Sequence, residues 1–327
     1  MSDREAWLAI VNPASGPARA RGRWTQFAEA LESAGVALEV AHTTGPHDGA
    51  RIARDAVLGG RRRLLAAGGD GSVNDVVNGL MEAGLDDPST VTLGVVPTGT
   101  GNDWARSLGL SRDPATLAAA VAAGRTLLHD VGRVDGPGIE GCGGATPGRH
   151  WFVNVAGAGL DAAASAAVPR PVTSAFTYLR VALRELVAWR SPRFRVDADG
   201  AVLRERLLLA FVANARYCGN RMLVAPQARL DDGLFEVIAI REVGVLRALP
   251  KLAKLYRGTL AGDPLVWQRR AAVVEIDAEP ATHVQADGQI AGTTPARFTL
   301  RSRALNVLVA PGAATGASPA HLSRDGG

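Results

Sequence analysis

The stretch "LLAAGGDGSVNDVVNGL", residues 64–80, places the carboxylate of Asp70 on a glycine turn between a buried strand and an amphipathic helix. Unpaired N–H groups at a helix N-terminus bind anions, and a phosphate can approach the backbone closely at the glycines, Gly68, Gly69 and Gly71. Asp70 would repel that phosphate unless a cation lay between them. The stretch therefore favours a magnesium nucleotide, with Ser72 as the predicted N-cap of the helix. A plain turn that ends a strand is the alternative.

Two more strand ends carry polar loops with glycine. "VVPTGTGNDWARSLGL", residues 95–110, repeats the order of strand, loop and helix, and "VNPASGPARARG", which contains Asn12, follows the first strand. The residues of the 95–110 loop that we expect in a pocket are Thr98, Gly99, Thr100, Asn102 and Asp103. Because parallel strands end at one edge of a sheet, these loops together predict a nucleotide cleft. Neither G-x-x-x-x-G-K-[ST] nor G-x-G-x-x-G occurs, so no P-loop or dinucleotide fingerprint is predicted.

The elements that must position these loops follow from the hydrophobic pattern. Up to about residue 133, short apolar runs alternate with helical periodicity, which is typical of a parallel sheet covered by helices on both faces. From 134 to about 303 the segments are strand-like with turns between them, apart from one helix that carries Arg180 and Arg184 and a further helical segment from about Val245 to Tyr256. We predict an α/β domain over 1–133, a β-rich antiparallel domain over 134–303, and a disordered tail over 312–327.

Composition narrows the function classes. Cys142 and Cys218 are the only cysteines, too few for a disulfide framework, and the 6 histidines show no zinc-ligand spacing. No stretch reaches the roughly 18–20 apolar residues of a membrane span, and no signal segment is evident, which favours a cytoplasmic protein. The net charge of +4 is compatible with an anionic membrane surface or a phosphate ligand, and equally with an arginine-rich genome.

The motifs "VNPASG", "GGDGSVNDVVNGL" and "PTGTGNDWARSLGL", in this order, resemble the soluble diacylglycerol kinase and sphingosine kinase family of lipid kinases, especially its bacterial members. The stretches "HDVGRV", "FVNVAGAGLDA", "APQARLDDGLFEV" and "VQADGQ" agree, so the resemblance covers about residues 7–311. It implies a nucleotide domain of the NAD kinase/phosphofructokinase type and a β-rich lipid-binding domain. It also implies that a last strand, at about 304–311, returns to pack with the first domain.

The activity that this resemblance implies is transfer of phosphate from ATP, with Mg2+, to a lipid hydroxyl in the cleft between the domains. Diacylglycerol, converted to phosphatidic acid, is the first expectation. The partner would be a lipid at a membrane surface that the protein contacts peripherally. No nucleic-acid partner is expected, and a homodimer stays open.

The resemblance also assigns roles by motif match. The residues around the nucleotide would be Asn12, Thr44, Gly69, Ser72 and Thr98. The acidic, magnesium-linked network would be Asp70, Asp103 and Asp130. Asp287 matches the general base, although an Asp-Gly pair is also an ordinary hairpin turn. "RLDDGL" matches a structural magnesium site, with Asp232 as side-chain ligand beside the carbonyls of Arg229 and Leu234; a plain turn is again the alternative.

The chain departs from the family pattern at two positions. Ser72 and Gln289 stand where the family commonly has threonine and glutamate. Glutamine is uncharged, so Gln289 can neither raise the basicity of Asp287 by repulsion nor help to hold a cation. A catalytically weak lipid- or nucleotide-binding protein is therefore one alternative, and a kinase for sphingosine or phosphatidylglycerol is another. A NAD kinase or phosphofructokinase shares the G-G-D-G turn but is disfavoured by "PTGTGNDWAR".

Overall fold

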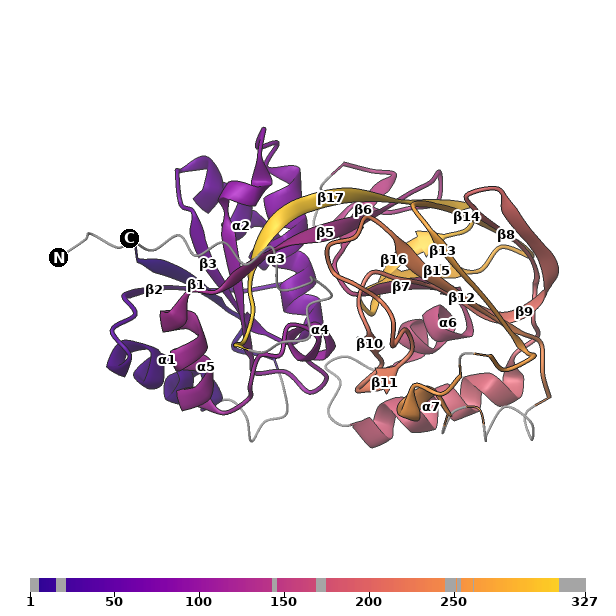
Figure 1. The fold of residues 1–327 in the computed structure, drawn as a ribbon, viewed down its shortest axis with the longest axis horizontal. Coiled ribbons are helices and arrows are strands. Elements are labelled where there is room, and N and C mark those ends of the chain that lie inside the picture. The colour runs from indigo at the N-terminus through magenta and orange to yellow at the C-terminus, as the bar shows by residue number, and fades with distance from the viewer. Residues whose placement is uncertain are drawn as a thin grey trace.

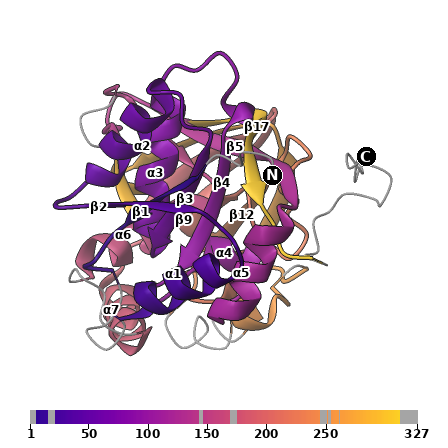
Figure 2. The same ribbon diagram turned by 90° about the vertical axis from the view of Figure 1, so that its left-hand side faces the viewer.

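The first domain is a parallel sheet with helices on both faces. The computed structural model describes residues 6–15, 22–142, 146–168, 175–244, 251, 254–260 and 262–311, without the side chains of 175–179 and 182. The elements of this domain are β1 (Trp7–Val11), α1 (Arg23–Ser33), β2 (Leu38–His42), α2 (Asp48–Leu58), β3 (Arg63–Gly68), α3 (Asp70–Glu82), η2 (Pro88–Thr90), β4 (Thr92–Pro97), α4 (Asp103–Ser107) and α5 (Pro114–Ala123). Strands run parallel in the order β2-β1-β3-β4. Helices α2 and α3 pack together on one face, and α1 and α5 on the other (Figure 2).

Local sequence explains how these elements begin and end. Residues 64–68 of β3 are all buried, as in a strand covered on both faces. Helix α5 starts where Asp113 accepts a hydrogen bond from the Thr116 N–H at 2.9 Å, and it ends at Gly124, whose φ is +64°. Helix α3 begins at Asp70 with Gly69 as its N-cap, so the prediction that Ser72 caps it is wrong. Ser72 lies inside the first turn, and its hydroxyl faces another loop.

The second domain is antiparallel, as predicted, and the predicted fold class is confirmed. Its elements are β5 (Thr126–Asp135), β6 (Arg149–Phe152), β7 (Val155–Gly159), α6 (Leu160–Ala167), α7 (Ala175–Ala188), β8 (Arg193–Ala198), β9 (Ala201–Ala213), β10 (Tyr217–Cys218), β11 (Met222–Leu223), β12 (Phe235–Arg241), β13 (Val266–Ala271), β14 (Val273–Glu279), β15 (His283–Ala286), β16 (Gln289–Thr293) and β17 (Ala296–Leu308). The helix predicted around Arg180 and Arg184 is α7. The tail predicted over 312–327 lies outside the described residues.

One strand joins the two domains. The first half of β17 pairs with β14 in the second domain, and its last residues pair in parallel with β4 in the first. Strand β5 follows β17 along both halves, and Figure 1 shows the pair arching from one domain to the other. The sheet is therefore continuous, and residues from both ends of the sequence complete the first domain. Within the described part of the chain, no helix is long and apolar enough to cross a bilayer.

The end of β17 that pairs with β4 should contribute strongly to the stability of the first domain. Leu308 is 1% exposed, and its Cδ1 lies 2.7 Å from the position a Cβ would take on Gly94 of β4. We expect Leu308→Ala to lower the free energy of unfolding by about 2–5 kcal/mol through lost burial and a cavity. Leu58→Ala is the matched control, because Leu58 is 61% exposed, and should cost less than about 0.5 kcal/mol. Equal losses in denaturant titrations of the two variants would contradict this placement.

Candidate active site

Three polar loops meet at the edge of the sheet where β1, β3 and β4 end. The Asn12 amide donates to Ser72 Oγ at 2.9 Å, and the hydroxyls of Ser15 and Thr98 lie 2.9 Å apart. The N–H groups of Thr98 and Gly99 donate to the Gly68 carbonyl at 3.2 and 3.1 Å. The structure thus brings together the loops that the sequence predicts to share one cleft.

Close backbone approach explains the glycines at this junction. A Cβ on Gly99 would lie 2.3 Å from Gly69 Cα, so a side chain there would push the two loops apart. A Cβ on Gly71 would lie 2.1 Å from the Gln289 side-chain nitrogen. Gln289 therefore lies against the first turn of α3, and the hairpin of the second domain reaches the loops of the first.

A cavity of about 750 Å3 opens between the domains at these loops. The sequence-predicted residues that line it are Asn12, Thr44, Gly69, Asp70, Gly71, Ser72, Gly99, Thr100, Asp103 and Asp287. Gly68, Thr98 and Asn102 stand behind this lining, where they hold the loops: the Asn102 amide, for example, donates to the Gly99 carbonyl at 2.8 Å. On the second-domain side the lining includes apolar residues, Val155, Val168, Phe211 and Met222. The first-domain side of the cavity is therefore polar and glycine-rich, and the second-domain side mixes these apolar side chains with polar ones such as Asp161, Ser165 and Gln285.

Asp70 and Asp103 form a linked pair in the cavity wall. Asp70 Oδ1 accepts hydrogen bonds from the N–H groups of Asp103 at 2.9 Å and Trp104 at 3.4 Å. The Asp103 carboxylate in turn accepts from the N–H groups of Asn220 and Arg221, each at 2.8 Å. Burial, followed by the charge of Asp103, raises the pKa of Asp70 to about 7. The pKa of Asp103 is also raised, mainly by burial.

The arrangement of Asp70 and Asp103 fits a divalent cation. A Cβ on Gly101 would lie 2.8 Å from Asp70 Oδ2 and 3.7 Å from Asp103 Oδ2, so both carboxylates turn an oxygen towards this glycine. Like charges so close destabilise each other, and a bound cation relieves that repulsion. Carboxylate oxygens are the ligands that Mg2+ prefers. Asp70 is the residue best placed to hold such an ion.

Asp287 occupies the turn between β15 and β16 and reaches across to the first domain. Its φ is +50° and that of Gly288 is +78°, the signs that a type I′ turn requires, so the hairpin interpretation of this pair is also correct. Its carboxylate accepts hydrogen bonds from the Asn74 amide at 3.1 Å and from the N–H groups of Val153, Asn154 and Val155 at 2.9, 2.8 and 3.2 Å. Burial raises the pKa of Asp287 to about 6, although these hydrogen bonds lower it.

Asp161 is a cavity residue that sequence reasoning missed. It lies in the first turn of α6, where Asp161 Oδ2 accepts from the Gln285 amide at 3.0 Å. Among the described residues, Oδ1 of this carboxylate is buried without a hydrogen-bond partner. Burial raises the pKa of Asp161 to about 6. The signal was present in the sequence, because "VAGAGLDA" repeats the order of strand, glycine, aspartate and helix seen in "LLAAGGDGS".

Asp130 lies elsewhere, with the loop predicted to bind a structural metal. Its carboxylate accepts from the N–H groups of Gly233 and Arg303, each at 2.6 Å, and it does not line the cavity. The structure therefore does not bring Asp130 into the acidic pair of Asp70 and Asp103. Asp130 instead joins the turn at Gly233 to Arg303 of β17, where the pairing register with β5 shifts.

In the 229–234 loop, arginines lie beside Asp232, the predicted side-chain ligand of magnesium. Asp232 forms an ion pair with Arg270, and Arg229 Nε lies 3.8 Å from Asp232 Oδ2. The Leu234 N–H donates to Asp232 Oδ1 at 3.2 Å. Among the described residues, the neighbouring Asp231 Oδ1 is buried without a hydrogen-bond partner. Magnesium at this loop stays a prediction.

Comparison with known proteins agrees with this architecture. The family model described as diacylglycerol kinase catalytic domain matches residues 6–134, and the model described as YegS C-terminal NAD kinase beta sandwich-like domain matches residues 154–309. A diacylglycerol kinase of Bacillus subtilis (strain 168) is 28% identical over 304 residues, 92% of this chain and 95% of the relative. A diacylglycerol kinase of Staphylococcus aureus (strain MRSA252) is 26% identical over 301 residues, 91% of this chain and 90% of the relative.

A solved structure confirms the fold. The crystal structure of a diacylglycerol kinase from Bacillus anthracis str. Sterne superimposes with a TM-score of 0.71 at 21% identity, over 95% of this chain and 99% of that one. At this level of identity, the likeness concerns the arrangement of the elements.

The raised pKa of Asp70 predicts how stability depends on pH. Between about pH 4 and 7 the folded protein keeps a proton on Asp70 that the unfolded chain releases, so without metal the free energy of unfolding falls as pH rises. Asp70→Asn keeps the acceptor oxygen and removes the buried charge. We expect the variant to match wild type near pH 4 and to exceed it by at least about 1 kcal/mol at pH 8.

Denaturant titrations in the presence of a chelator measure this difference. Asp86→Asn is the control, since the Asp86 side chain is exposed, and should leave the pH dependence of wild type unchanged. If Asp70→Asn gains no stability at pH 8, the surroundings of Asp70 do not raise the pKa of its carboxyl group in the folded protein.

Proposed function

We propose that this chain, a lipid kinase whose two domains match the diacylglycerol kinase catalytic-domain and YegS C-terminal-domain models, transfers the γ-phosphate of ATP, as the magnesium complex, to the free hydroxyl of diacylglycerol. The observation that carries the proposal is the position of Asp287, which is buried and lines the same cavity as the glycine loops and the apolar side chains of the second domain. A phosphate donor fits the glycine loops, and an acyl-bearing acceptor fits the apolar side chains.

The loops of the first domain would bind the nucleotide. Gly69 and Gly71 lie at the start of α3, where backbone N–H groups would bind the phosphates, and the Thr44 hydroxyl donates to Asp48 Oδ2 at 3.1 Å. Asp70 would hold Mg2+, which neutralises phosphate charge when it is bound. Phosphoryl transfer depends mainly on such positioning and charge stabilisation, because the protein takes little part in the covalent step.

Asp287 would act as the general base. The lipid hydroxyl oxygen attacks the γ-phosphorus, the bond from that phosphorus to the β,γ-bridging oxygen breaks, ADP leaves, and the hydroxyl proton passes to the carboxylate of Asp287. The four donors around this carboxylate occupy its four acceptor positions. The hydroxyl must therefore displace one of them, and the two longest bonds, from Asn74 and Val155, are the weakest.

The first experiment follows phosphate from labelled ATP to micellar lipids, with diacylglycerol, monoacylglycerol, sphingosine, ceramide and phosphatidylglycerol assayed side by side. We expect magnesium-dependent labelling of diacylglycerol and a loss of about 10²–10⁴ in rate for Asp287→Asn, the usual contribution of a general base. Asp277→Asn, on the exposed face of β14, is the control and should retain full rate. If only sphingosine or phosphatidylglycerol is labelled, diacylglycerol is the wrong substrate, but the assignment of the cleft as the active site still holds.

A catalytically weak protein is the second candidate, and Gln289 is the observation behind it. This uncharged side chain lies against Gly71 at the position where the family commonly carries glutamate. Gln289→Glu adds a carboxylate beside Asp287, which should raise the basicity of Asp287 and strengthen cation binding. We expect a rise in rate at saturating magnesium and a shift of the acid limb of the pH profile to higher pH. An inert wild type whose Gln289→Glu variant phosphorylates lipid would identify this residue as the cause of the inactivity, whereas inertness of both would argue against the kinase reaction.

A further inference from the structure

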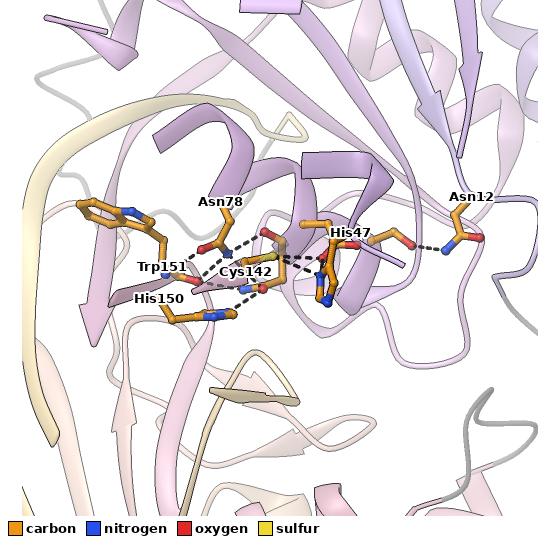
Figure 3. A network of polar contacts seen from close by, with 9 residues as sticks. Asn12, His47, Asn78, Cys142, His150 and Trp151 are labelled. Carbon is orange, nitrogen blue, oxygen red and sulfur yellow. Dashed lines mark hydrogen bonds and ion pairs between the residues drawn. The ribbon is translucent and has the colours of Figure 1, made fainter. Parts of the chain in front are cut away.

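Three side chains of different types converge beside the cavity. His47 precedes α2, Asp75 belongs to the second turn of α3, and Cys142 lies in the connection between β5 and β6 (Figure 3). Their ligand atoms, His47 Nδ1, Asp75 Oδ1 and Cys142 Sγ, all lie within 4.8 Å of one another. The individual distances are 3.1 Å from nitrogen to oxygen, 3.4 Å from sulfur to nitrogen and 3.3 Å from sulfur to oxygen.

We propose that His47, Asp75 and Cys142 form a binding site for a divalent transition-metal ion of the zinc class. Tetrahedral Zn2+ with its usual bond lengths places its nitrogen, oxygen and sulfur ligands about 3.3–3.6 Å apart. The observed triangle is smaller than this by only a few tenths of an ångström. Thiolate and imidazole ligands select zinc-like ions over Mg2+, which prefers oxygen alone.

The geometry argues against a nucleophilic triad of the same three residues. In such a triad the histidine faces the nucleophile with one ring nitrogen and the carboxylate with the other. Here the same atom, His47 Nδ1, is the one that approaches both Cys142 Sγ and Asp75 Oδ1. Three ligand atoms that all lie within 4.8 Å of one another are an arrangement that a metal ion can use.

Access and surroundings suit a site with an open coordination position. Cys142 is 4% exposed, whereas the His47 side chain is 48% exposed, so an ion can enter from the histidine side. Three protein ligands leave a fourth tetrahedral position for water.

A bound ion would fasten the connection between the domains. Residues just before Cys142 contact β16, since the Glu140 N–H donates to the Ala291 carbonyl at 2.6 Å and Ile139 forms a bridge with Gly292. Strand β16 begins two residues after Asp287. The ion would thus tie α2 and α3 of the first domain to the hairpin that carries Asp287. The site itself does not depend on the proposed kinase reaction.

Metal binding to the full chain tests the proposal. We expect one Zn2+ per chain by titration calorimetry in excess Mg2+, and a thiolate-to-metal absorption band when Co2+ replaces Zn2+. Cys142→Ser should abolish the band, and the matched control Cys218→Ser should retain it. His47→Asn should weaken Zn2+ binding by at least about 10-fold, because loss of an outer-shell partner alone costs about 10–100-fold.

The histidine variant guards against a folding artefact. His47 has a φ of +59°, a left-handed conformation that asparagine tolerates, and its side chain is half exposed, so the variant should fold. His42→Asn on the exposed end of β2 is its matched control and should bind as wild type does. Failure of the wild type to bind one Zn2+, equal binding by His47→Asn, or loss of the Co2+ band in Cys218→Ser would each overturn the proposal.

Discussion

The carboxylate of Asp287 is the charge on which the arrangement of the two domains depends. It is 8% exposed, and burying an ionised carboxylate is costly unless donors surround it. One donor, Asn74, comes from α3 of the first domain, and three N–H groups come from residues 153–155 of the second. Moving the domains apart would remove a partner from a buried charge, so this carboxylate holds the cleft at a defined width.

The other cavity carboxylates work against stability. Asp70, Asp103 and Asp161 each have a raised pKa, because burial disfavours their ionised forms. A protein selected only for stability would replace them with neutral side chains. They all line a single cavity, and under the proposed function a bound cation would balance their charge.

The sequence alone predicts the structural features that are determined by residues close together along the chain. Strands β1, β3 and β4 are neighbours in the sheet, so the loops that follow them lie together, as the local patterns predict. A hydrogen bond from the Asn12 amide to Ser72 Oγ joins two of these loops. Features fixed by distant segments were not reached in this way. No spacing relates His47 to Asp75 and Cys142, which is why a search for zinc-ligand patterns along the chain found none. The position of Asp130 likewise depends on backbone from Gly233 and Arg303.

Helix α3 connects the two ends of the cavity. Its first turn carries Asp70 and Ser72 at the glycine loops. One turn after Asp70, the Asn74 amide donates both to Asp287 and to the Trp151 carbonyl, at 3.1 and 3.0 Å. Asn74 Oδ1 is itself fixed by His150 and Asn78 at 3.0 and 3.1 Å. If the proposed acceptor hydroxyl displaces the Asn74 amide from Asp287, one N–H keeps the Trp151 carbonyl and the other loses its acceptor, which costs free energy in a buried side chain. The same helix therefore carries both the residues at the glycine loops and a donor to Asp287, so it fixes the two ends of the cavity relative to each other.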